Sequence, residues 1–374
     1  MAIFDVPLDE LRRRTSIKWT RFDADVLPMF VAEMDARVQE PVVARIEQAL
    51  RDGDTGYPEQ PVYQRAYADF AAWRWGWRPS TEAAVTTGDV MQGIRHALHA
   101  VTDPGDPVVV NPPIYPPFRQ VVAATGRRLV EVPLVDDRLD LEGLARAFAD
   151  GARAHLLCSP HNPNGTVHTR DELEQVARLA REHDVWVIVD EIHAPLSGEE
   201  FTPFLSLDDP GRALLSTSAA KGFNLAALKA GLLFASDEAR PVLDRLPSHV
   251  WEASSHLGIL AHATALTECR DWVVQAGQEI AQHKQLFAEL LREQLPPLTY
   301  TPSEATYLAW LDCSALGLDD PGRTFHEVGR VRFNLGREFA PDHEQWVRVN
   351  LATSPAVIAE GVSRMAGAVT RTNS

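Results

Sequence analysis

The sequence predicts an α/β protein: a large domain with a mostly parallel sheet between helices, and a smaller α+β domain. From about residue 85, short apolar runs rich in β-formers alternate with helical patterns, which is typical of βαβ units and a parallel sheet. After about residue 255 the pattern changes to long helices, expected over 256–268 and 271–295. We therefore expect a large domain over residues 46–256, and a small domain built from residues 1–45 and 257–374.

The individual elements follow from local patterns. Thr169 and Glu172 stand at capping-box spacing before an apolar stripe, so a helix is expected over 170–183. Ser354-Pro355 opens a final helix. The strands expected in the large domain are AVTT, PVVVN, HLLCS, VWVIVDE, ALLSTS and AGLLFAS, and those in the small domain are TYLAWLDC, VRFNLG and WVRVNLA. The first 45 or so residues lack a βαβ pattern and are expected to pack on the small domain or on a partner chain.

Composition narrows the possible partners. Apolar residues make up 45% of the chain and charged residues 24%, which indicates a packed globular protein. The net charge of −16 would repel nucleic acid and anionic lipid, so neither is expected as a partner. Cys158, Cys269 and Cys313 have neither metal-ligand spacing nor the density of a disulfide framework, which favours the reducing cytoplasm. No window approaches the roughly 18 apolar residues of a membrane span.

Four segments occur in the order that a phosphate-bearing aldehyde cofactor would need. The first is TTGDVMQGI at 86–94, where a strand breaks and a helix begins. The unpaired N–H groups of a first helical turn can bind phosphate, which makes Gly88, Asp89 and Val90 candidates. Taken alone, this fragment is more often an ordinary strand-to-helix turn, and an aspartate suits a phosphate site only if its side chain points away.

The second and third segments end two buried strands. SPHNPNGTV lies at the carboxyl edge of the sheet, where Asn162 could donate to a phenolate oxygen, although these residues also serve ordinary turns. VWVIVDEIH ends in a carboxylate, Asp190, whose burial is costly without a positive partner. A protonated pyridine nitrogen would be such a partner. A structural Asp190, or metal binding by Asp190, Glu191 and His193, are the alternatives, and no second ligand cluster supports the metal.

The fourth segment is STSAAKGFNLAALKAG at 216–231, where a strand runs into a turn of small residues and then Lys221. Apolar surroundings lower the pKa of a lysine and favour the free amine that forms an imine and moves protons. An isolated lysine after a strand is more often a surface residue. The three preceding segments make Lys221 the candidate for a Schiff base.

Taken together, TTGD, NPPIYPPF, SPHNPNGTV, VDEIHAPL, STSAAKGFNLAALKAG and WVRVNLAT resemble the fold-type I aminotransferase superfamily of pyridoxal 5′-phosphate (PLP) enzymes. HNPNG, DEIH and KGFNLAALK resemble its cystathionine β-lyase and C–S lyase branch. The resemblance extends over KWTRFDADVLPMFVAEMD and the GYP at 56–58, which is nearly the whole chain. It implies the PLP-transferase type I fold and a homodimer.

The resemblance also implies residue roles. Lys221 would form the Schiff base, Asp190 would pair with the pyridinium nitrogen, and Arg348 would clamp the substrate carboxylate. Two departures concern phosphate binding: Ala220 stands where serine is frequent, and Asp89 where the family often has an apolar residue. The remaining roles are stacking on the ring by Tyr115, contact with its phenolate side by Asn162 and His193, and phosphate binding by Gly88, Asp89, Val90, Ser218, Lys229 and, from the neighbouring subunit, Tyr57.

The implied reaction is β-elimination of a thiol from an L-cysteine thioether, giving pyruvate and ammonia. Lys221 would remove the α-proton as general base. Return of that proton to the cofactor would instead make the chain an aminotransferase acting on an L-amino acid and a 2-oxo acid. A PLP-binding domain used for regulation is a third possibility, which the absence of a basic patch disfavours.

Overall fold

The computed structural model describes residues 2–58 and 61–372, and the chain forms two compact units. Of these residues, 38–58, 61–161 and 166–273 form the large unit, and 2–37, 162–165 and 274–372 form the small unit. The sequence-based division placed the boundaries at 45/46 and 256/257. In the structure α11 (His256–Glu268) packs against both α3 (Glu40–Asp52) and α4 (Val62–Trp75), and all three helices belong to the large unit.

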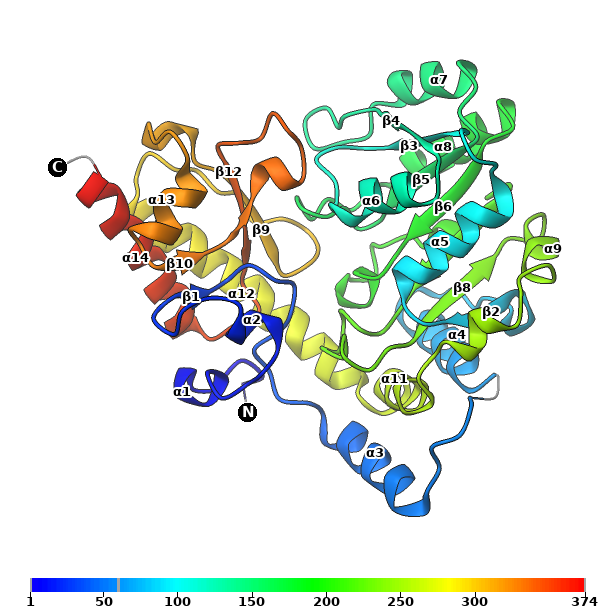
Figure 1. Ribbon diagram of the computed structural model, residues 1–374, viewed down its shortest axis with the longest axis horizontal. Coiled ribbons are helices and arrows are strands. Elements are labelled where there is room, and N and C mark those ends of the chain that lie inside the picture. Colours follow the sequence, from blue (N-terminus) through cyan, green and yellow to red (C-terminus); the bar gives the residue numbers. More distant parts are fainter. Residues whose placement is uncertain (1, 59–60, 373–374) are drawn as a thin grey trace. The chain divides into compact units, whose positions relative to one another are not determined.

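The large unit is built on a seven-stranded sheet in the order β2-β8-β7-β6-β5-β3-β4 (Figure 1). Only β8 runs antiparallel to its neighbours, so the sheet is mostly parallel, as the alternating pattern predicts. The strands are β2 (Ala84–Thr87), β3 (Pro107–Val110), β4 (Arg128–Glu131), β5 (Ala154–Cys158), β6 (Trp186–Asp190), β7 (Ala213–Thr217) and β8 (Gly231–Ala235).

Helices cover both faces of this sheet, because successive strand residues point to opposite sides. Ile188 joins one apolar cluster with α5 (Val90–Val101) and α6 (Pro117–Ala124). Val187 and Val189 join a second cluster with α7 (Leu141–Ala149) and α8 (Arg170–Glu182). The predicted capping box of α8 is confirmed, since Thr169 and Glu172 bond reciprocally. Two short helices, α9 (Arg240–Leu243) and α10 (His249–Glu252), follow β8.

The small unit has an antiparallel sheet in the order β11-β12-β9 and a two-stranded parallel pair, β1 with β10. The run VRFNLG, predicted as one strand, is divided between β10 and β11, which belong to different sheets. The strands are β1 (Leu27–Pro28), β9 (Leu308–Asp312), β10 (Val331–Arg332), β11 (Asn334–Leu335) and β12 (Trp346–Asn350), and the helices are α1 (Leu8–Leu11), α2 (Ile17–Thr20), α12 (Arg270–Gln294), α13 (Pro321–Glu327) and α14 (Pro355–Thr372).

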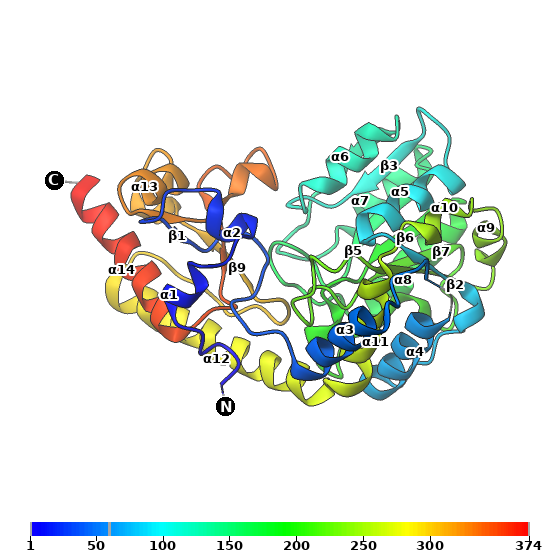
Figure 2. The same cartoon turned by 60° about the horizontal axis from the view of Figure 1, so that its bottom comes forward.

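The long helices lie where the sequence predicts them: α8, α11 and α12 correspond to the helices expected over 170–183, 256–268 and 271–295. In Figure 2, α3 lies beside α11 in the large unit, and α12 and α14 form the helical layer of the small unit. No helix in residues 2–58 and 61–372 is both long and apolar enough to span a membrane.

Candidate active site

Asp190 ends β6 as a buried carboxylate, only 4% exposed. Its Oδ1 accepts a hydrogen bond of 3.0 Å from the amide of Ile192. Burial raises the pKa of Asp190 to about 7, against the opposing effects of this hydrogen bond and of the positive charge of Lys221. A buried carboxylate with a raised pKa is stabilised by a further cation. The site therefore fits a cofactor that brings a protonated ring nitrogen.

Glu191 is fully buried beside it, and its Oε1 accepts a hydrogen bond of 2.7 Å from the amide of Phe204. Burial, followed by the neighbouring charge of Asp190, raises the pKa of Glu191 to about 8. Near neutral pH the Glu191 carboxyl is therefore largely protonated. Within the described part of the chain, no group of three or more His, Cys, Asp or Glu side chains could hold a metal ion.

Lys221 follows β7 on a turn that several hydrogen bonds hold in place. The Ser218 hydroxyl donates to the Ala230 carbonyl at 2.7 Å and accepts from the Ala220 amide at 3.1 Å. The amide of Phe223 donates to the Ala219 carbonyl at 3.0 Å. Lys221 itself is half-buried and close enough to Asp190 to influence its pKa. The structure thus brings together the two residues on which the sequence argument rests.

Two residues that sequence reasoning missed, Tyr63 and His262, support the same turn. The amide of Ala219 donates to the Tyr63 hydroxyl at 3.0 Å, and this hydroxyl lies 3.0 Å from Nδ1 of His262. Both side chains are fully buried. A histidine inside the apolar run HLGILAHATAL was the signal available in the sequence, because a lone polar residue on a buried helix requires a partner.

The predicted phosphate turn lies at the N-terminus of α5. Asp89 is the N-cap of this helix, and its Oδ1 accepts a hydrogen bond of 2.9 Å from the amide of Gln92. Its Oδ2 lies 3.0 Å from Nζ of Lys229, so Lys229 pairs with Asp89. The Asp89 carboxylate is engaged by these two partners, and a phosphate here would be held by backbone N–H groups where α5 begins, at Val90 and at Gly88 just before the N-cap.

Three further candidates occupy different surroundings in the large unit. Tyr115 is half-buried and meets the ring of Phe118 edge-on, with ring centroids 6.1 Å apart. His193 is buried and precedes a short 3₁₀ helix after β6. Tyr57 lies between α3 and α4 and is 88% exposed, so its side chain makes little contact within its own chain.

Arg348, on β12, is buried in the small unit together with Asn162. Its Nη1 donates to Oδ1 of Asn162 at 2.9 Å, and its Nη2 donates to Oδ1 of Asn334 at 2.7 Å and to the Phe30 carbonyl at 3.2 Å. The guanidinium also lies 4.9 Å from the ring centroid of Phe339. Sequence reasoning grouped Asn162 with the cofactor ring and missed Asn334. Asn334 is the β11 residue paired with Arg348, a relationship that only the strand register reveals.

Comparison with known proteins shows the family to which the chain belongs. The chain belongs to the family described as aminotransferase class I and II, whose model matches residues 32–365. A protein of Mycobacterium tuberculosis (strain CDC 1551 / Oshkosh) named "Putative cystathionine beta-lyase" is 41% identical, with 96% of each chain covered. The cystathionine beta-lyase of Corynebacterium glutamicum is 32% identical, with coverage of 96% of this chain and 98% of that protein.

A solved structure extends the similarity to the whole fold. A "putative plp-dependent beta-cystathionase" from Corynebacterium diphtheriae superposes with a TM-score of 0.92 at 30% identity, covering 99% of each chain. The predicted resemblance to the aminotransferase superfamily and its C–S lyase branch is confirmed, and so is the PLP-transferase type I fold.

Proposed function

We propose that this chain is a PLP-dependent C–S β-lyase that releases a thiol from an L-cysteine thioether such as cystathionine. The observation that carries the proposal is the buried carboxylate of Asp190, with Lys221 near enough for its positive charge to lower the pKa of that carboxyl, because the two residues would supply an anion and an amine for one cofactor ring. Relatives named cystathionine beta-lyase support the substrate class. When bound, PLP acts as an electron sink that acidifies the α-proton of an amino acid.

In the proposed reaction, Arg348 and Lys221 would have the following roles. Arg348 holds the substrate carboxylate, since its planar guanidinium is suited to two parallel hydrogen bonds. Lys221, as a free amine, takes the α-proton from carbon. The electron pair left by that C–H bond forms a carbon–carbon double bond as the C–S bond breaks, and the sulfur leaves as a thiolate. Addition of water then yields pyruvate and ammonia.

The remaining cofactor contacts are proposals of the same kind. Tyr115 would stack on the cofactor ring, and Asn162 and His193 would face its phenolate oxygen. The phosphate would be bound by the turn at Gly88, Asp89 and Val90 with Lys229, and with Ser218 once its hydroxyl turns from the Ala230 carbonyl to which it donates. In this assignment Asp89 contributes its backbone, because its carboxylate is engaged by Gln92 and Lys229.

The reaction is tested by supplying cystathionine and cysteine S-conjugates to the purified protein and measuring pyruvate and free thiol. We expect equal amounts of both, and loss of both in Lys221→Ala. The rival reaction is transamination, which the family match also favours. Amino transfer to a 2-oxo acid without thiol release would establish the rival. A protein whose visible absorption is unchanged by added PLP, or unaltered by Lys221→Ala, would contradict both.

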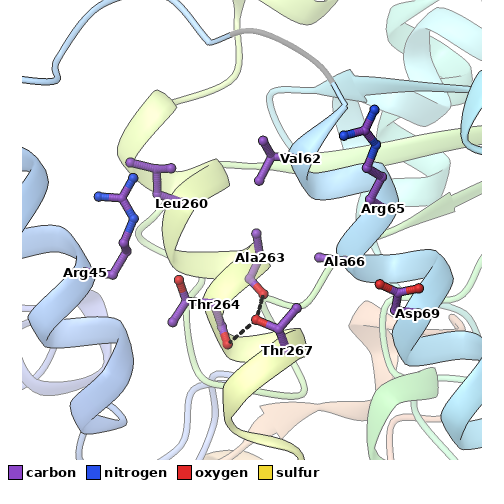
Figure 3. Close-up of a pocket in the computed structure, with 9 residues that line it drawn as sticks. All are labelled: Arg45, Val62, Arg65, Ala66, Asp69, Leu260, Ala263, Thr264 and Thr267. Carbon is purple, nitrogen blue, oxygen red and sulfur yellow. Dashed lines mark hydrogen bonds between the residues drawn. The ribbon is translucent and has the colours of Figure 1, made fainter.

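We also infer that the active form is a homodimer in which Tyr57 binds the phosphate of the neighbouring subunit. Tyr57 is 88% exposed and Val62 is 50% exposed. Beside Val62 an open groove of about 430 Å³ lies between α3, α4 and α11 (Figure 3). Exposed apolar residues around a groove favour protein contact. The groove is lined by Arg45, Val62, Arg65, Ala66, Asp69, Leu260, Ala263, Thr264 and Thr267.

Complementation tests the Tyr57 assignment directly. The Lys221→Ala chain is expected to be inactive alone, and the Tyr57→Ala chain to be weakly active. In a mixed dimer, one site would combine the intact Lys221 of one chain with the intact Tyr57 of the other, so co-expression should restore activity. If activity is not restored in a proven mixed dimer, Tyr57 does not act in the site of the neighbouring subunit. A monomer by light scattering would overturn the homodimer.

A cytoplasmic location belongs to the same proposal. It is supported by the buried thiols of Cys158, Cys269 and Cys313, which form no disulfide and suit a reducing compartment.

A further inference from the structure

Lys284 is a buried lysine on α12 that the proposed reaction does not use. It is 3% exposed, and its Nζ donates to the carbonyls of Ser303 at 2.8 Å and Ala305 at 2.9 Å. Burial lowers the pKa of Lys284 to about 7. Removing an amine from water is energetically costly. The two hydrogen bonds that Lys284 donates to the segment at 303–305 offset this cost. A neutral amine still has two N–H groups for these two carbonyls, so the contact does not require the charge.

The segment that Lys284 holds, residues 303–306, has a strained backbone. Thr306 has a φ of +62°, in the left-handed region. A β-branched residue is uncommon there, and such a conformation persists only where the surroundings hold it. The Thr306 hydroxyl accepts a hydrogen bond of 3.1 Å from the Leu308 amide. Lys284 thus fixes a segment whose own preference is for another conformation.

On its other side this segment contacts Gly165. The amide of Ala305 donates to the Gly165 carbonyl at 2.9 Å. A β-carbon at Gly165 would come within 2.6 Å of the Ala305 carbonyl oxygen, and Gly165 itself has a φ of +77°. The backbones therefore approach as closely as glycine permits. Gly165 ends the short segment 162–165, which begins with Asn162, the partner of Arg348.

We propose that Lys284 is a positioning residue for the substrate-carboxylate site: it clamps residues 303–306 against Gly165 and thereby orients Asn162 and Arg348. Every link is a contact within the small unit. The inference rests on the proposed role of Arg348 in holding the carboxylate. Because that carboxylate is bound in elimination and in amino transfer alike, the effect of Lys284 is the same for either reaction.

The test compares Lys284→Met with the unmodified holoenzyme. We expect KM for the amino-acid substrate to rise about tenfold, because a misplaced Arg348 would lose about one hydrogen bond to the charged substrate carboxylate. The value of kcat should change far less. Hydrogen exchange should become faster both at 303–306 and at 162–165. Lys284→Gln keeps N–H donors, so KM and the rate of hydrogen exchange should both change less in this variant. It replaces Lys284→Met as the test variant if the methionine variant does not fold.

Leu291→Ala is the matched control, because Leu291 lies on the same helix in the apolar core of the small unit. It should lower stability without raising KM or exchange at 162–165. Thr306→Gly added to Lys284→Met should lower KM part of the way back to the value of the unmodified enzyme, since glycine adopts the positive φ without strain.

The proposal is overturned if Lys284→Met leaves KM and exchange at 162–165 unchanged, if Leu291→Ala raises KM equally, or if Thr306→Gly gives no recovery. Failure of the proposed function is a separate result: the unmodified chain would then neither release thiol nor transfer an amino group. In that case the exchange data still decide whether Lys284 fixes the segment at 162–165.

Discussion

The hydroxyl of Tyr63 lies 3.0 Å from Nδ1 of His262, and this pair supports the turn that carries Lys221. Nε2 of His262 faces the carbonyl of Leu225, which can only accept, so Nε2 carries the hydrogen. Burial lowers the pKa of His262 to about 4, which keeps the ring neutral and leaves Nδ1 as an acceptor. Tyr63 therefore donates to His262 and accepts from the amide of Ala219.

Tyr63→Phe should weaken PLP binding. The substitution removes the acceptor of the Ala219 amide and the donor to His262, so the turn before Lys221 loses its support. We expect the Kd for PLP to rise about tenfold, which corresponds to one or two buried hydrogen bonds. Titration of the cofactor-free protein by visible absorption measures this. Tyr300→Phe, which alters a half-buried tyrosine of the small unit, should leave the Kd unchanged, and an equal rise in that variant would contradict the assignment.

Asp190→Asn should abolish most of the activity while the fold persists. The substitution keeps the shape of the side chain but removes the charge proposed to pair with the ring nitrogen. We expect kcat/KM to fall by at least about 10²-fold, the scale for loss of one preorganised electrostatic partner. Asp184→Asn, at an exposed position before the other end of β6, is the control and should retain activity. Near-normal kcat/KM in Asp190→Asn would show that Asp190 is a structural carboxylate.

Arg348→Lys should raise KM much more than it lowers kcat. Lysine retains the positive charge but cannot reproduce the planar fork that donates to Asn162 and Asn334. We expect KM to increase by about tenfold to a hundredfold, as for loss of a charge-assisted hydrogen bond. Steady-state kinetics over a range of substrate concentrations measures both constants. Arg364→Lys, at a half-buried position of α14, should leave KM as it is. An unchanged KM in Arg348→Lys would exclude Arg348 from the substrate site.

Glu191→Gln should flatten the dependence of stability on pH. The folded-state pKa of Glu191 is raised from 4.5 to about 8, so between these values the folded protein holds a proton that the unfolded chain has released. The contribution of Glu191 to the free energy of unfolding is therefore complete below about pH 4.5 and is lost as pH rises toward 8. Urea unfolding of the cofactor-free protein from pH 5 to 8 should show a smaller decline in Glu191→Gln than in the unmodified chain. Parallel curves would refute the buried proton.

The long elements could be predicted from the sequence because their patterns are local. The capping box at Thr169 and Glu172, the alternation of strands and helices, and the order of the motifs around Lys221 all depend on residues near one another in the chain. Local chemistry also singled out Asp190, since a carboxylate at the end of an apolar strand requires explanation wherever it lies.

Tertiary structure alone decided which distant side chains act together. Tyr63 meets His262 and Ala219, Arg348 meets Asn162 and Asn334, and Lys284 meets the carbonyls at 303 and 305. None of these pairs has a characteristic spacing, because the partners lie on different elements and the register between those elements sets the contact. The sequence by itself thus determined the fold class, the family and the residue proposed to hold the cofactor. The packing of the elements determined which buried polar groups support that residue and the arginine, because a buried donor is satisfied only by whatever acceptor the fold places beside it.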